Sequence, residues 1–219
     1  MAKLLKNNGL TLALLLLFAS SITGQWLAGW HVTNEELRQH GGAAMTLAGY
    51  TVSPDFLSAV FENWESEFLQ MAMYVLLTGI LVQRGSAESR DPDDGPRDGD
   101  LASQAHGPGA PRVLRAGRFA RAIYSHSLFL ALAALFLVSF VIHWTQSARV
   151  AAQQAIEHGV RPPTMLGYLG DAQLWFESLQ NWQSEFLSTA VLVVLSIFLR
   201  QRESPESKPV AAPHGRTGS

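Results

Sequence analysis

Four apolar runs of membrane-spanning scale constrain this chain more than any other feature. They cover residues 10–30, 68–82, 128–144 and 186–199, and polar stretches separate them. A helix rises about 1.5 Å per residue, so the first run can cross a hydrocarbon core of roughly 30 Å. Backbone groups in lipid must be satisfied internally, and the runs lack the alternation of barrel strands. The sequence therefore predicts an all-α, polytopic membrane protein with four transmembrane helices.

The basic residues predict how these helices are oriented. Thirteen Lys and Arg lie before the first run, between the second and third runs, or after the fourth, and three lie in the other two connections. Lys and Arg are enriched on the cytoplasmic side of multi-pass proteins, so we expect both termini and the central loop in the cytoplasm. The alternative at the N-terminus is a cleaved secretory signal, because Lys3 and Lys6 precede a leucine run that ends near Ala19.

An offset of 118 residues maps the first half of the chain onto the second without a gap. The clearest match is NWESEFL at residues 63–69 against NWQSEFL at residues 181–187, and 29 of the 80 pairs that begin with Leu10 are identical. Each copy contains two predicted spans, an even number, so both copies would enter the membrane in the same orientation. The sequence thus predicts two tandem helical hairpins related by a pseudo-two-fold axis along the membrane normal.

The repeat divides the chain into four segments. Residues 1–84 form the first transmembrane hairpin repeat and residues 125–202 the second. Residues 85–124 are expected to be a cytoplasmic linker, disordered at first because Pro and Gly are frequent in it, and then basic. Residues 203–219 are expected to be a disordered cytoplasmic tail.

The basic part of the linker is a candidate contact for anionic lipid. Its arginines recur every three residues with apolar side chains between them, which suits a short helix on the inner leaflet. The simpler interpretation is ordinary positive-inside anchoring without lipid specificity. The four side chains are Arg112, Arg115, Arg118 and Arg121.

Local signals predict where the hairpin helices begin and end. The polar segment after the first run is closed by Gly41, a residue that commonly stops helices. Ser53 followed by Pro54 predicts the start of the next helix, and Asp171 does so in the second copy.

The doubled Asn-Trp-x-Ser-Glu-Phe-Leu motif supplies the candidate polar site. Only a short apolar stretch follows the second motif, so a full span must draw in Glu185, and by the same argument Glu67. Ionisable groups at that depth normally face the bundle interior or a wet cavity. Asparagine and glutamate are four residues apart in each motif and share a helix face. The candidate residues are Asn63, Ser66, Glu67, Asn181, Ser184 and Glu185.

Two interpretations of this site remain open. Glu67 and Glu185 would serve proton exchange or cation attraction if they faced each other across the pseudo-two-fold axis. Alternatively they make interhelical hydrogen bonds near the interface, while tryptophans form an aromatic belt. Glu62 and Glu65 do not add to the functional case, because glutamines replace them in the second copy. The interface aromatics are Trp26, Trp64, Trp144 and Trp182.

Several classes of function lack support. The chain has no cysteine, which excludes disulfides and thiolate chemistry, and its net charge of -2 gives no electrostatic case for nucleic acid. No established catalytic or nucleotide-binding motif is present, and the seven histidines do not follow a metal-ligand spacing. We therefore expect no enzyme activity, cofactor or metal.

The doubled motif, together with Gly9-Leu10 at the first span and the Gln-Arg-Gly-Ser-Ala-Glu-Ser segment from Gln83, resembles an uncharacterised family of bacterial four-helix membrane proteins, a domain-of-unknown-function group. The resemblance implies a bacterial inner-membrane location and carries over no activity. We expect a non-enzymatic protein with a structural, stress-related or assembly role. The alternative is a small ion- or proton-coupled transporter or channel, which would require a homodimer because four helices are few for a solute pathway.

Overall fold

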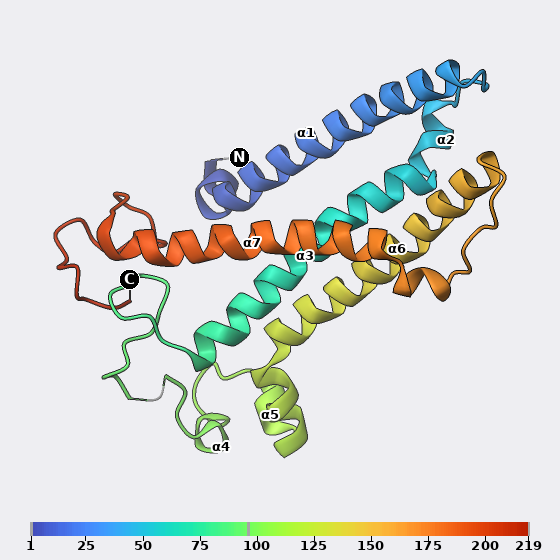
Figure 1. Ribbon diagram of the computed structural model, residues 1–219. Coiled ribbons are helices and arrows are strands. Elements are labelled where there is room, and N and C mark those ends of the chain that lie inside the picture. The colour runs from blue at the N-terminus through green and yellow to red at the C-terminus, as the bar shows by residue number, and fades with distance from the viewer. Residues whose placement is uncertain (1, 96, 219) are drawn as a thin grey trace. The chain divides into compact units, whose positions relative to one another are not determined.

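The computed structural model describes residues 2–95 and 97–218, and all the secondary structure in these residues is helical (Figure 1). Four long helices dominate: α1 (Ala2–Gln39), α3 (Pro54–Ile80), α6 (Ser127–Glu157) and α7 (Ala172–Phe198). The short α-helices are α2 (Leu47–Thr51), α4 (Leu101–Gln104) and α5 (Arg118–Ser125), and the 3₁₀ turns are η1 (Arg112–Arg115) and η2 (Gly167–Gly170). The all-α prediction is confirmed.

Two of the long helices have the length and composition to cross a membrane. These are α1, from Leu5 onward, and α6. The leucines along the first half of α1 are exposed, Leu16 for example by 68%. An apolar surface of this kind suits contact with lipid. The helices α3 and α7 are also long, with 27 residues each, but their N-terminal halves carry carboxylates.

The chain divides into two compact units. Unit 1 consists of residues 1–60 and 142–169, and unit 2 of residues 61–141 and 170–219. Because the division falls inside α3 and α6, each of these helices contributes residues to both units.

In unit 1 the loop after α1 folds back onto the helix. Asn34 holds it in place: its side chain donates to the carbonyl of Met45 at 3.1 Å and accepts from the amide of Met45 at 2.6 Å. Trp30 Nε1 donates to the same carbonyl at 2.8 Å. Farther along, Tyr50 lies so close to Gly29 that a Cβ there would be 2.1 Å from the phenol oxygen. A glycine is therefore required where α2 approaches α1.

The ends of the long helices follow the predicted signals. Ser53 Oγ accepts from the amide of Phe56 at the start of α3, and Asp171 Oδ1 accepts from the amide of Gln173 at the start of α7. Gly41 after α1 has φ +70° and Gly159 after α6 has φ +67°. Both helices thus end in the left-handed residue that glycine favours.

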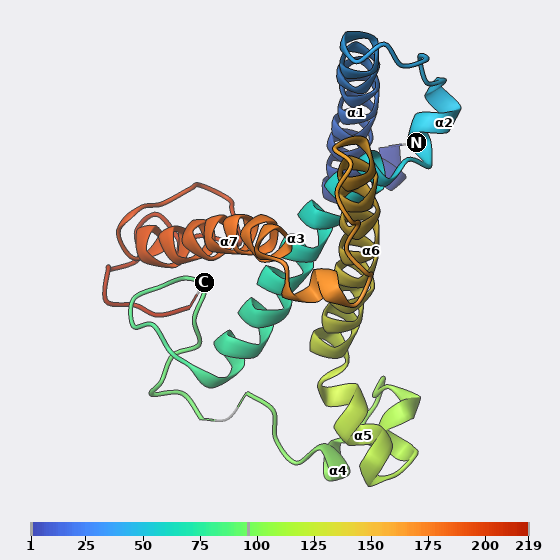
Figure 2. The same cartoon turned by 45° about the vertical axis from the view of Figure 1, so that its right-hand side comes forward.

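In unit 2 the linker contains a small helical cluster. Figure 2 shows α4 and α5 beside each other, with η1 in contact with both. Arg115 Nε donates to the carbonyl of Ala105, and Arg121 Nη1 donates to the carbonyl of Leu114. Two of the four predicted lipid-contacting arginines therefore also hold the cluster together. Phe119 on α5 is 79% exposed.

The left-handed ending of α1 makes a specific prediction for stability. Gly41→Ala is expected to destabilise the protein by roughly 1–2 kcal/mol, because φ +70° is unfavourable for an L side chain although nothing lies within 4 Å of the added Cβ. Thermal unfolding in detergent measures the effect. Gly24→Ala, inside α1 and equally unobstructed, is the control and should be neutral or stabilising. A Gly41→Ala protein as stable as wild type would contradict the left-handed ending.

Candidate functional site

A buried carboxylate joins α3 to α7 in unit 2. The side chain of Glu65 on α3 is 0% exposed. From α7, Ser178 Oγ donates to Glu65 Oε1 at 2.7 Å and Trp182 Nε1 donates to the same oxygen at 3.3 Å. Ser178 is itself 0% exposed. A buried carboxylate is stable only when hydrogen bonds replace its lost hydration, and α7 supplies them here.

Two further polar bridges extend this joint along the helices, and we call all three together the α3–α7 seam. Asn181 Nδ2 donates to Glu62 Oε1 at 2.6 Å. Toward the other end, Gln70 Nε2 donates to Thr189 Oγ1. Gln70 follows Glu62 on α3, and its partner Thr189 likewise follows Asn181, the partner of Glu62, on α7. The two helices therefore run in the same direction along the seam.

Aromatic rings pack around the donor indole of the seam. Trp182 lies edge-to-face with Trp175, with ring centroids 6.4 Å apart, and with Phe136 of α6 at 6.0 Å. Phe140 contacts Trp175 at 6.1 Å. Edge-to-face pairs of this kind are favourable, so the cluster orients Trp182 toward Glu65.

The other predicted interface aromatics are also half-buried and engaged with the protein. In unit 1, Trp26 Nε1 donates to Thr51 Oγ1 at 2.9 Å and Trp144 Nε1 donates to the carbonyl of Met165 at 3.0 Å. Trp64 packs edge-to-face against Phe61 in α3. Within unit 1, then, Trp26 attaches α2 to α1, and Trp144 attaches the loop after α6 to that helix.

The predicted polar residues are distributed unevenly over the seam. Asn181 takes part in it, and Ser66 is buried with its hydroxyl donating to the carbonyl of Asn63. The side chain of Glu67 is exposed, whereas Glu185 is half-buried and near enough for the two charges to interact. The remaining two, Asn63 and Ser184, are exposed.

Glu62 and Glu65, which the sequence argument set aside, provide the carboxylate acceptors of the seam. Their counterparts 118 residues later are glutamines, so the repeat pattern pointed away from them. The informative signal is that the two copies differ here, with glutamate in the first copy and glutamine in the second. A carboxylate accepts hydrogen bonds and does not donate them when ionised, so two facing glutamates could not form such a joint, whereas glutamate on one copy can bind donors on the other.

A second polar structure follows the ends of α3 and α7, where the sequence repeats Gln-Arg-x-Ser-x-Glu-Ser. In the first turn the backbone N–H of Gln83 donates to Ser89 Oγ at 2.9 Å. In the second turn the backbone N–H of Gln201 donates to Ser207 Oγ at 2.9 Å. The third residue is left-handed in both turns. It is Gly85 with φ +82° in the first and Glu203 with φ +65° in the second.

The tail, residues 203–218, folds back onto the first of these turns. Lys208 is 0% exposed, and the three N–H groups of its ammonium are shared among four backbone carbonyls. The acceptors are Gly85 O at 2.5 Å, His214 O at 2.8 Å, Arg216 O at 3.0 Å and Ile197 O at 3.2 Å. The Gly218 amide also donates to Ser86 O at 2.9 Å. The tail therefore has a defined path along the ends of α3 and α7.

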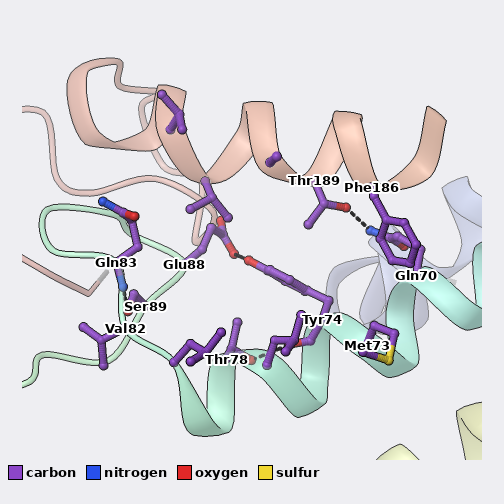
Figure 3. A pocket seen from close by; sticks show the side chains of 15 residues that line it. Gln70, Met73, Tyr74, Thr78, Val82, Gln83, Glu88, Ser89, Phe186 and Thr189 are labelled. Atoms are coloured by element: carbon purple, nitrogen blue, oxygen red, sulfur yellow. Dashed lines mark hydrogen bonds between the residues drawn. The ribbon is translucent and has the colours of Figure 1, made fainter. Parts of the chain in front are cut away.

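Beside this contact, α3 and α7 border an apolar groove of about 490 Å³, shown in Figure 3. The Tyr74 hydroxyl reaches across it and donates to Glu88 Oε2 at 2.6 Å. Glu88 Oε1 is buried and has no hydrogen-bond donor in the described part of the chain, although the Glu206 side chain lies within hydrogen-bonding reach. Burial, together with the nearby charge of Glu206, raises the pKa of Glu88, and the bond from Tyr74 opposes this.

The seam predicts a sharp difference between two neighbouring carboxylates. Glu65→Ala leaves the Ser178 hydroxyl and the Trp182 indole without their acceptor, so we expect a loss of about 1–3 kcal/mol in unfolding free energy. Glu67→Ala, the control, removes an exposed carboxylate and should change stability by less than about 0.5 kcal/mol. Denaturant unfolding of the purified protein in detergent measures both. A greater loss in Glu67→Ala than in Glu65→Ala would contradict the assignment.

Comparisons with known proteins give a family without an assigned activity. No curated protein and no solved structure matches the chain. A family model does match, over residues 1–219, and its description is Domain of unknown function (DUF6766). The expected relation to an uncharacterised family is confirmed: the chain belongs to the family Domain of unknown function (DUF6766).

Proposed function

We propose that this protein is a four-span membrane protein with a non-enzymatic structural or assembly role, in which the α3–α7 seam joins two tandem helical hairpins. The observation that carries the proposal is the burial of Glu65 with two hydrogen-bond donors from α7. A carboxylate enclosed in this way makes an interhelical joint. In this proposal the polar residues of the α3–α7 seam serve to hold the two helices together.

Four spans and like-oriented hairpins are supported by sequence and geometry together. The helices α1 and α6 have the composition of spans, and each is followed by a 27-residue helix whose apolar half ends at an arginine-containing turn. The parallel direction of α3 and α7 in unit 2 is the direction that hairpins of the same orientation require. A pseudo-two-fold axis along the membrane normal would relate the hairpins.

The basic linker and termini support a cytoplasmic side and an inner-membrane location. Phe119 and Ile123 of α5 are exposed on one helix face, and Arg118 adjoins them. This combination is typical of a helix that lies on an anionic leaflet. The lipid bilayer is thus the principal partner in this proposal, with anionic lipid at the linker.

Topology is tested in the cysteine-free background of the native chain. A cysteine replacing Ser103 should not react with a membrane-impermeant maleimide in intact cells and should react after permeabilisation, because the central loop is placed in the cytoplasm. The control, Ala44→Cys in the loop between α1 and α3, should react in intact cells. Labelling of Ser103→Cys before permeabilisation would refute the orientation.

The second candidate function is proton or cation transport through Glu67 and Glu185. The observation that favours it is the proximity of the two charges, with Glu67 exposed. Paired carboxylates attract cations and exchange protons. Four helices leave little room for a solute pathway, so this candidate requires a homodimer.

Liposome flux separates the two candidates. In a structural protein, proteoliposomes should conduct protons and cations no faster than protein-free liposomes. If the carboxylates conduct, wild-type flux should be lost in the Glu67→Gln, Glu185→Gln double variant, because an amide neither titrates nor carries the charge. Glu157→Gln, an exposed position at the end of α6, is the matched control and should behave as wild type. Wild-type flux that disappears only in the double variant would overturn the structural role.

A further inference from the structure

We propose that Glu88 binds a proton where the C-terminal tail docks, and that a hydrogen bond from this proton to the Glu206 carboxylate fastens the tail to the turn that follows α3. The two carboxyls occupy the same position in the two Gln-Arg-x-Ser-x-Glu-Ser turns, 118 residues apart. All the groups concerned belong to unit 2, so the proposal does not depend on the number of membrane spans.

The hydrogen bonds around Glu88 leave a place for that proton. One carboxyl oxygen of Glu88 accepts from the Tyr74 hydroxyl, as Figure 3 shows. The other oxygen is buried without a donor in the described residues, while Glu206 lies within hydrogen-bonding reach. Two carboxylates brought together cannot both stay ionised without strong repulsion, whereas a carboxyl–carboxylate pair forms a hydrogen bond. A shared proton satisfies the buried oxygen and removes the repulsion.

The remaining bonds of the tail do not depend on protonation of a carboxyl. The Lys208 ammonium is held by backbone carbonyls alone in the contacts described above. At the end of the tail, the Gly85 amide donates to Thr217 Oγ1 at 3.0 Å. The carboxyl pair is therefore the attachment that depends on a carboxyl proton. The tail also contacts α7 through His214, whose Nδ1 lies 3.2 Å from Ile197 O, and the glutamine substitutions below distinguish that contact from the carboxyl pair.

The charged neighbours fix the direction of the pH dependence. Glu88 is faced by Tyr74 from α3 and by Glu206 from the tail. Arg200 at the end of α7 is turned toward carbonyls of its own helix and toward Ala212 O, and Arg84 in the first turn pairs with Asp93. Burial raises the pKa of Glu88 above its ordinary value of 4.5, so the docked tail binds a proton more strongly than the released tail. Docking is then strongest at low pH and weakens as the pH rises through the raised pKa.

Spin labels on the full-length protein in lipid nanodiscs test this coupling. Cysteines replacing Arg90 and Val210, both exposed, carry the labels in the native cysteine-free background. Double electron–electron resonance then measures the distance between them from about pH 4 to about pH 8. We expect one narrow distance at low pH and a broader, longer distribution at high pH. The docked-to-released ratio should change by at most about tenfold per pH unit, the limit for one proton.

Glutamine substitution identifies the proton. In Glu88→Gln the amide oxygen can still accept from Tyr74, and the amide N–H donates to Glu206 in place of the shared proton. The tail should then stay docked across the whole pH range. Glu206→Gln is the reciprocal substitution and should give the same result, which guards against a folding defect in the first variant.

Two further variants calibrate the measurement. Lys208→Met, which removes the four carbonyl contacts, should release the tail at every pH. Glu157→Gln, outside unit 2, should keep the wild-type pH response. A wild-type distance that does not respond to pH, or a response that survives both glutamine substitutions, overturns the proposal.

Discussion

The free-energy cost of burying a carboxylate is the constraint on which the α3–α7 pairing depends. Glu65 is removed from water, and the hydrogen bonds that Ser178 and Trp182 donate to it offset the lost hydration. These donors are four residues apart on α7, so they present one face to α3. Register and direction of the two helices are fixed together, because sliding either helix by a turn would leave a buried polar group without a partner.

Apolar contacts alone would not give the same specificity. In lipid, neighbouring hydrocarbon side chains gain little from contacting one another rather than the acyl chains, and polar bridges distinguish one helix pairing from another. The exposed leucines of α1 and the bridged carboxylates of α3 illustrate the two roles. A seam of this kind can fix the pairing of two long helices through side-chain hydrogen bonds.

The sequence was sufficient for the helices and insufficient for their contacts. Ser53, Asp171 and Gly41 act locally, so cap and stop signals predicted them from neighbouring residues alone. Glu65 could not be found in this way, because its donors lie more than a hundred residues away in the chain and the repeat pattern favoured symmetric positions. Lys208 was missed for a related reason: a Pro-rich tail predicts disorder, and the four carbonyls around its ammonium come from three separate segments.

The left-handed residues of the two turns affect the order in which the turns can form. Gly85 adopts its conformation at no steric cost, whereas Glu203 at φ +65° carries a backbone penalty of roughly 1–2 kcal/mol. The first turn therefore forms without a steric penalty at this position. The second needs outside contacts, and the groups that the tail binds include Gly85 and Ser86 of the first turn. During synthesis the turn after α3 would form first, because it precedes the tail in the chain. The turn after α7 would then form as the tail binds to the first turn.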